Sequence, residues 1–165
     1  MIRLLRRLLK MPITKAIFVD CDGVLLSDEF AKHCLETEGY DPFDRDDLDP
    51  RALRNLKYIV DKTGAEIILS SSWRWDENAL NAVKRQFKEH NLVLADTTIM
   101  NIMSTLSRTD EIQLYLREHP SVTKYVILDD DEIRAPLKKN WVRCLFKNGL
   151  TRKLAEQAIE ILEEK

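Results

Sequence analysis

A run of apolar residues that ends in two acids is the feature that most constrains the fold. Residues 15–20 read KAIFVD, and the chain continues with Cys21, Asp22 and Gly23. A continuous apolar run of this length is typical of a strand buried on both faces, as in a parallel sheet. Acids at the carboxyl end of such a strand face the crevice in which open α/β sheets bind ligands. The run therefore predicts an α/β domain with Asp20 and Asp22 at its ligand-binding edge.

The same pattern returns twice. Residues 65–69, which read AEIIL and are apolar except for Glu66, run into three serines at 70–72, and the apolar residues 125–128 run into three aspartates at 129–131. Because parallel strands present their carboxyl ends at one edge, these polar clusters are expected to lie together. Helical patterns separate the strands, which predicts a three-layer α/β/α Rossmann-like fold with a mostly parallel central sheet. We expect helices at about 28–36, 50–63, 77–89, 109–118 and after Thr151, and further strands within 92–100 and at 141–146.

Length and charge predict one domain with a basic arm. The chain has 165 residues, and we expect a single domain over 15–165 preceded by an arm at 1–14. The first fifteen residues hold five basic residues and no acid, whereas the other 21 basic residues stand against 28 acidic ones. The acidic body argues against a general affinity for nucleic acid or membrane. The arm, with leucines on one helical face, is expected to contact a polyanion or a membrane surface, or to dock as a terminal turn.

The cysteines and the hydropathy point to an intracellular protein. Cys21, Cys34 and Cys144 have no metal-ligand spacing, and an odd number of cysteines favours reduced thiols. No apolar run approaches the roughly 18 residues that a membrane-spanning helix needs. We therefore expect a cytoplasmic location. Cys21 stands between two acids that disfavour a thiolate, so it is not expected to act as a nucleophile.

The predicted edge is rich in carboxylates. Asp20, Asp22, Asp129 and Asp130 would meet there with a serine, and no histidine or thiol completes the set. Oxygen ligands alone favour Mg²⁺ over zinc. Gly23 lets the backbone leave the strand in a conformation that other residues resist.

The motifs, taken in order, resemble a known superfamily. VDCDG, IILSSSWR, an arginine before a helix, and YVILDDD are similar to the motifs of the haloacid dehalogenase-like (HAD) aspartate-nucleophile phosphohydrolases. The longer stretches TGAEIILSSSWR, SRTDEIQLYLREHP, KYVILDDD and NGLT resemble the Swiss Army Knife RNA-repair-type HAD domains, over about 15–160.

The resemblance implies a role for each motif residue. Asp20 matches the nucleophile that takes the phosphoryl group, and Asp22 matches the general acid and base. Ser70 matches the hydroxyl that holds the phosphoryl oxygens. Asp129 and Asp130 match the acids that hold the metal, together with Asp20 and the main-chain carbonyl of Asp22. The implied cofactor is Mg²⁺.

A cation is needed to neutralise the phosphoryl oxygens. Arg108, before a predicted helix, matches the position that the RNA-repair-type branch uses, and Lys138 or Lys139 is the alternative. Arg74 is expected either to contact a phosphate or to lie on the surface.

The remaining residues near Ser70 carry open alternatives. Gly23 and Ser71 are expected to border the phosphate, although the Ser71 hydroxyl can instead serve the turn. Trp73 and Trp75 are expected to pack in the core or to stack on a base.

The implied activity is Mg²⁺-dependent phosphomonoester hydrolysis through an aspartyl-phosphate. About 25 residues separate Gly23 from the first long helix, so no large cap domain is expected. An open site admits a large phosphorylated substrate, and the resemblance points to nucleic-acid ends or nucleotides. The alternatives are a phosphatase of small metabolites or phosphoproteins, and a non-catalytic HAD-like binding module.

Overall fold

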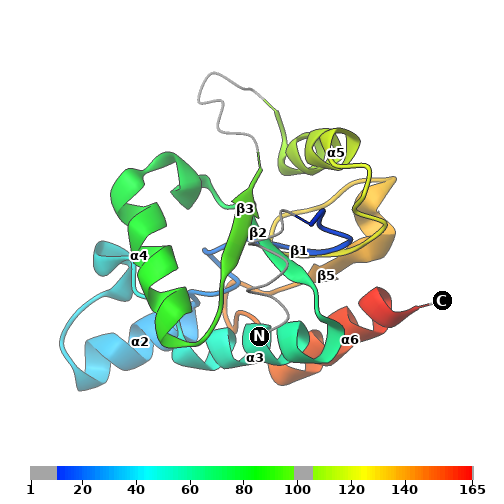
Figure 1. The fold of residues 1–165 in the computed structure, drawn as a ribbon. Helices are drawn as coiled ribbons and strands as arrows, with labels where there is room; N and C mark the ends of the chain where they lie inside the picture. Colours follow the sequence, from blue (N-terminus) through cyan, green and yellow to red (C-terminus); the bar gives the residue numbers. More distant parts are fainter. Residues whose placement is uncertain (1–10, 99–105, 165) are drawn as a thin grey trace.

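A five-stranded parallel sheet forms the centre of the domain. The computed structural model describes residues 11–98 and 106–164. The strand order is β3-β2-β1-β4-β5, and every pair is parallel (Figure 1). The strands are β1 (Lys15–Val19), β2 (Glu66–Leu69), β3 (Leu94–Thr97), β4 (Lys124–Asp129) and β5 (Trp141–Arg143). The parallel α/β fold that the sequence predicts is confirmed.

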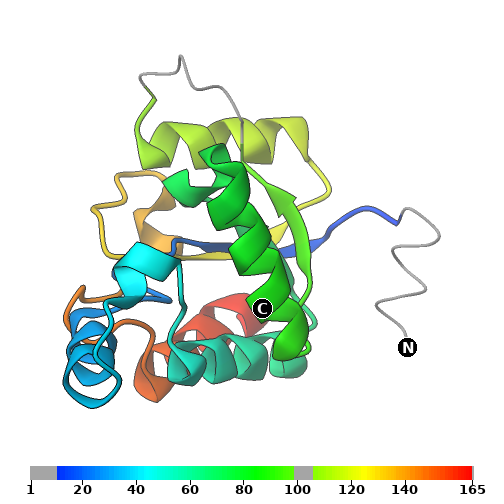
Figure 2. The same ribbon diagram turned by 90° about the vertical axis from the view of Figure 1, so that its left-hand side faces the viewer.

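Helices cover both faces of the sheet. α3 (Pro50–Thr63) and α6 (Arg152–Glu163) lie against one face, α5 (Arg108–Glu118) lies against the other, and Figure 2 shows this layering. α4 (Glu77–Glu89) shares the core cluster of α3 and α6 and lies beside β3. The two faces have separate apolar clusters because the side chains of each strand alternate between them. The three-layer prediction is confirmed.

Helix α5 begins at a well-defined residue. The Ser107 hydroxyl accepts a hydrogen bond from the Asp110 N–H, and the Asp110 carboxylate accepts one from the Ser107 N–H, which forms a capping box. This cap makes Arg108 the first residue of the helix. Because α5 packs on the sheet through Ile112 and Tyr115, its amino-terminal end is held in place.

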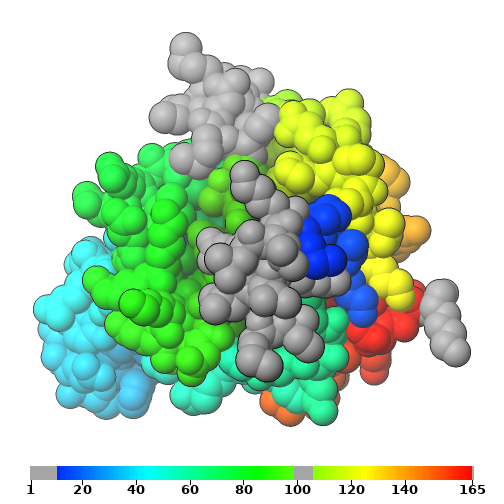
Figure 3. All heavy atoms as spheres, in the orientation of Figure 1, coloured from blue at the N-terminus to red at the C-terminus, as the bar shows by residue number. Residues whose placement is uncertain are grey.

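The segment between β1 and α3 contains no cap domain. It folds as α2 (Asp28–Thr37) and the short 3₁₀ helix η1 (Pro42–Arg45). α2 lies at the lower left of the molecule in Figure 3, below α4. The prediction that no large cap interrupts this segment is therefore confirmed.

The strand expected at 141–146 is shorter than predicted. β5 ends at Arg143, and the carbonyl of Leu145 accepts hydrogen bonds from the N–H groups of Asn148 and Gly149. The resulting turn is tied to the segment after β1, because the Leu150 N–H donates to the Val24 carbonyl at 2.8 Å. Leu145 and Phe146, whose apolar character suggests a longer strand, therefore belong to a turn that packs against another segment.

Part of the expected organisation lies outside the described residues. This applies to residues 1–10 of the basic arm and to residue 99 onward of the predicted strand region 92–100. Among the described residues, no helix is long and apolar enough to cross a bilayer.

Gly149 provides a test of this turn. Its φ is +64°, and a Cβ there would lie 2.7 Å from the carbonyl oxygen of Val24. Gly39 has φ +72° and open space where a Cβ would lie, so it is the matched control. We expect Gly39→Ala to cost about 1 kcal/mol and Gly149→Ala to cost about 2 kcal/mol more, because only the latter also forces backbone apart. Urea unfolding measures both, and equal losses would contradict the close approach.

Candidate active site

Three polar residues stand side by side at the carboxyl edge of the sheet. The last residue pairs of β1 with β2 and of β1 with β4 are in register, so the next residue of each strand is Ser70, Asp20 or Asp129. The Asp20 N–H donates to the carbonyl of Leu128 at 3.0 Å, and the Ser70 N–H donates to that of Val19 at 3.0 Å. The ladder thus continues past the strands and holds the three residues in one row.

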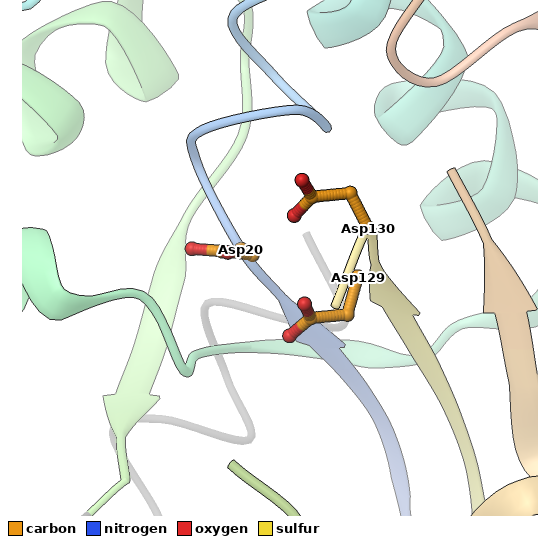
Figure 4. A group of neighbouring side chains, drawn as sticks. All are labelled: Asp20, Asp129 and Asp130. Carbon is orange, nitrogen blue, oxygen red and sulfur yellow. The ribbon is translucent and has the colours of Figure 1, made fainter. Parts of the chain in front are cut away.

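Three carboxylates gather at this row. Oxygen atoms of Asp20, Asp129 and Asp130 lie within 4.8 Å of one another, and Figure 4 shows the three side chains at the carboxyl ends of β1 and β4. Asp129 is fully buried, and its Oδ2 has no hydrogen-bond partner. A buried oxygen without a hydrogen bond, in a cluster of oxygens alone, fits a hard cation such as Mg²⁺.

Gly23 allows this cluster to form. Its φ is +71°, and a Cβ at this position would lie 2.5 Å from the Cγ of Asp130. The turn after β1 therefore comes against the Asp130 side chain at a point where no side chain fits. This close approach gives Gly23 a steric role beside the cluster.

Asp22 stands apart from the carboxylate cluster. Its side chain is half-buried and is not in the three-carboxylate group, and its Oδ2 accepts a hydrogen bond from Trp73 Nε1 at 3.0 Å. Burial raises the pKa of the Asp22 carboxyl, although the Trp73 hydrogen bond opposes this shift. A raised pKa suits a group that must donate a proton. Trp73 also packs against the core, which favours the packing alternative for this residue.

Arg108 reaches into the carboxylate cluster from the start of α5. Its Nε lies 3.0 Å from Asp129 Oδ2, without hydrogen-bond geometry, and its Nη2 lies 3.4 Å from Asp20 Oδ2. Burial lowers the pKa of Arg108, but the neighbouring carboxylates outweigh it and leave the pKa raised. Lys138 and Lys139 are exposed on the 3₁₀ helix η3 (Leu137–Asn140). Of the three candidate cations, the structure brings Arg108 to the cluster.

Arg74 lies in the interior rather than on the surface. It belongs to the 3₁₀ helix η2 (Ser72–Trp75), and only 1% of it is exposed. Its Nη2 lies 2.7 Å from Glu111 Oε1, and its Nη1 donates to the carbonyls of Ser70 at 2.7 Å and Ser71 at 2.6 Å. The guanidinium also lies 4.7 Å from the ring centre of Trp75, which is 39% exposed. These contacts hold Arg74 in the interior, beside the main chain of Ser70 and Ser71.

The two serines differ in what their hydroxyls do. The Ser70 Oγ is buried and has no hydrogen-bond partner, so it is available to a ligand. The Ser71 Oγ accepts a hydrogen bond from the Trp73 N–H at 3.3 Å, which corresponds to the turn alternative. Burial and the nearby Asp20 raise the pKa of the Cys21 thiol, in agreement with its not being a nucleophile.

Sequence reasoning missed two buried polar residues beside the site, Glu111 and Thr98. Glu111 contacts both Arg74 and Arg108, and its position three residues after Arg108 on a helix is the signal that points to it. Thr98 follows β3 and continues the row beside Ser70, because its N–H donates to the carbonyl of Leu69 at 3.0 Å. Its buried Oγ1 has no hydrogen-bond partner.

The sheet order and the acids at the ends of β1 and β4 define a HAD-like class of α/β protein. Over residues 16–155 the chain matches the family described as the HAD domain in Swiss Army Knife RNA repair proteins, and it belongs to that family. The resemblance seen in the sequence is thereby confirmed. No curated protein and no solved structure matches the chain.

The crowded carboxylates make a prediction for the protein without metal. Burial and the nearby Asp20 raise the pKa of Asp129 to about 7, whereas an unfolded aspartate has a pKa of about 3.9. Between these values the unfolded chain releases the proton that the folded protein retains, so stability from this group is lost as pH rises to about 7. In EDTA, we expect Asp129→Asn to match wild-type stability near pH 4 and to exceed it at pH 8 by up to about 4 kcal/mol.

Denaturant titrations at the two pH values measure this difference. Glu132→Gln, an exposed change three residues further along the chain, is the control and is expected to show no such pH dependence. An Asp129→Asn effect of equal size at both pH values would contradict the raised pKa.

Proposed function

We propose that this protein is a Mg²⁺-dependent phosphomonoester hydrolase that forms an aspartyl-phosphate on Asp20. The observation that carries the proposal is the row in which Asp20 stands between Ser70 and Asp129, with the Arg108 guanidinium beside it. One edge of the sheet thus brings together the proposed nucleophile Asp20, the Ser70 hydroxyl, the proposed metal ligand Asp129 and the Arg108 cation. Membership of the HAD family supports a phosphohydrolase activity.

The metal would be held by Asp20, Asp129 and Asp130, with the main-chain carbonyl of Asp22. When bound, Mg²⁺ supplies positive charge that offsets the repulsion between an anionic phosphate and an attacking carboxylate. The three carboxylate groups fit this role because they converge and because Asp129 Oδ2 is buried without a hydrogen bond.

In the first half of the reaction, a carboxylate oxygen of Asp20 forms a bond to phosphorus while the bond from phosphorus to the leaving oxygen breaks. Asp22, whose burial favours the protonated form, gives its proton to that leaving oxygen. The Cys21 N–H donates to Asp20 Oδ1 at 2.7 Å and so orients the carboxylate. Arg108 and the Ser70 hydroxyl bind the phosphoryl oxygens and stabilise the charge that they carry.

In the second half, Asp22 is a carboxylate and takes a proton from a water molecule. The water oxygen attacks phosphorus, the bond from phosphorus to Asp20 breaks, and inorganic phosphate leaves. Asp20 is then a free carboxylate again, and Asp22 is protonated for the next cycle. The hydrogen bond from Trp73 fixes the Asp22 side chain through both halves.

The substrate that we favour is the phosphorylated end of a nucleic acid. The family is that of RNA repair proteins, and the segment between β1 and α3 holds only α2 and η1, so no cap domain there restricts substrate size. Nucleotides, small metabolites and phosphoproteins are the competing substrates. A cytoplasmic location fits a substrate of this kind and belongs to the same proposal.

The nucleophile is tested first. Asp20→Asn keeps the shape of the side chain and removes its negative charge, so we expect hydrolysis of p-nitrophenyl phosphate in Mg²⁺ to fall by a factor of about 10³ or more. Asp61→Asn, an exposed change on α3, is the control and is expected to keep full activity. Full hydrolysis by folded Asp20→Asn protein would rule out the covalent mechanism, and an inactive wild type on every phosphomonoester would favour a binding module.

The cation is tested on substrates of two sizes. If Arg108 binds the phosphoryl oxygens, Arg108→Ala should lower kcat by roughly 10²-fold on both p-nitrophenyl phosphate and phosphorylated oligonucleotides. Arg108→Lys keeps the charge without the fork of donors, so an intermediate loss is expected. Lys138→Ala is the control, because Lys138 is exposed on η3. A loss that appears only in KM and only for oligonucleotides would place Arg108 on a neighbouring phosphate instead.

The same substrates test the nucleic-acid assignment. Wild-type protein should have a higher kcat/KM for an oligonucleotide end than for p-nitrophenyl phosphate, and added salt should weaken this preference by screening phosphate contacts. Equal values that do not change with salt would leave the phosphatase proposal standing and remove the nucleic-acid one.

A further inference from the structure

Glu111 is a buried carboxylate to which the proposed reaction assigns no role. It lies on α5, only 4% of it is exposed, and each of its oxygens faces a different arginine. Oε1 lies 2.7 Å from Arg74 Nη2, and Oε2 lies 3.6 Å from Arg108 Nη1. Glu111 therefore links the arginine of the site to an arginine of the interior.

Arg74 extends this link to the main chain beside the site. Its Nη1 donates to the carbonyls of Ser70 and Ser71, which are the first two residues after β2. The Ser70 Oγ is the buried hydroxyl without a hydrogen bond in the row of site residues. The chain of contacts Arg74–Glu111–Arg108 thus joins the cation of the site to the segment that carries its hydroxyl.

Stability alone is a weak reason for such a chain. Removing charged groups from water is costly, and well-packed apolar residues often give equal or greater stability than a buried ion pair. Burial indeed lowers the pKa of Arg74, although Glu111 opposes this shift. What a buried ion pair with fixed partners does provide is a defined position for each charged group.

Arg108 needs such a fixed partner because its other contacts are shared. Asp20 and Asp129, which lie on its other side, are also the groups proposed to hold the metal and the phosphoryl group. When they do so, their attraction for the guanidinium is weakened. Glu111 is not in the three-carboxylate group, so its charge remains available to Arg108.

We infer that Glu111, anchored by Arg74, is a positioning residue that holds the Arg108 guanidinium at the phosphoryl-binding position. The inference rests on the proposed function, since it assumes that Arg108 binds the phosphoryl group. It adds a residue that touches neither substrate nor metal. The competing explanation is that Glu111 and Arg74 only join α5 to η2.

The test compares Glu111→Gln and Glu111→Asp with Glu118→Gln, an exposed change on the same helix. Glutamine removes the charge, whereas aspartate keeps it and draws it back from Arg108. For Glu111→Gln we expect tungstate, a tetrahedral anion that mimics phosphate, to bind about 10-fold more weakly in Mg²⁺, and kcat on p-nitrophenyl phosphate to fall about 10- to 100-fold. Glu111→Asp should show smaller losses, Mg²⁺ affinity should stay near that of wild type, and Glu118→Gln should change nothing.

A second measurement follows Arg108 directly and needs no activity. The ¹H–¹⁵N signal of the Arg108 Nε–H, assigned with Arg108→Lys, should exchange slowly with solvent in wild-type protein and faster in Glu111→Gln. If wild type hydrolyses no phosphomonoester but this exchange difference appears, the proposed function fails while the positioning of Arg108 stands.

The inference is overturned if the folded variants exchange this proton as wild type does and bind tungstate with wild-type affinity. A loss of melting temperature without those two changes supports the purely structural explanation and overturns it equally. If Glu111→Gln does not fold, the same two measurements are made on Glu111→Asp, which keeps a negative charge beside the buried arginines. Wild-type tungstate affinity and proton exchange in that variant would refute the inference.

Discussion

Negative charge crowded at the ends of β1 and β4 is the constraint on which the site depends. Asp20, Asp129 and Asp130 converge within 4.8 Å, and Asp129 is fully buried. Burial, together with the like charge of Asp20, raises the pKa of Asp129 and of Asp130. A fold that places them there gives up stability unless positive charge enters the cluster, and among the described residues Arg108 supplies it from α5. Strongly perturbed ionisable groups of this kind are characteristic of functional sites.

The sheet makes this crowding possible because its central strand is buried and paired on both sides. β1 lies between β2 and β4, and its residues from Ala16 to Val19 are completely buried. Hydrogen bonds continue on both sides of β1 at its carboxyl end, so Asp20 and its neighbours cannot move apart without breaking the ladder. Alternation along the strands then sends Asp20, Ser70 and Asp129 toward the same face as Phe18, which is the face that α5 covers. The helix that covers this face is also the one whose first residue is Arg108.

Much of this arrangement is readable from the sequence, since it follows from local pattern and parallel topology. Apolar runs that end in polar residues specify both the strands and the edge at which Asp20, Ser70 and Asp129 meet. Ser107 and Asp110 form a local cap, so the start of α5 is specified within four residues. Arg74 is different, because its burial depends on Glu111, which lies 37 positions away on a helix whose own pattern gives no hint of that partner. The end of β5 is missed for the same kind of reason, since the following turn depends on contacts with the segment after β1.

The geometry also explains why an arginine suits position 108. Its guanidinium has charged neighbours in different directions, with Asp129 at Nε, Asp20 at Nη2 and Glu111 at Nη1. A lysine ammonium is a compact charge on a flexible stem, so it lacks the planar fork that presents separate nitrogens to separate carboxylates. In the proposed reaction, the arginine would keep one nitrogen on Glu111 while the others turn from Asp20 and Asp129 to phosphoryl oxygens. In that proposal Glu111 and Arg108 act together, because the buried carboxylate fixes the guanidinium and the planar fork leaves other donors free for the substrate.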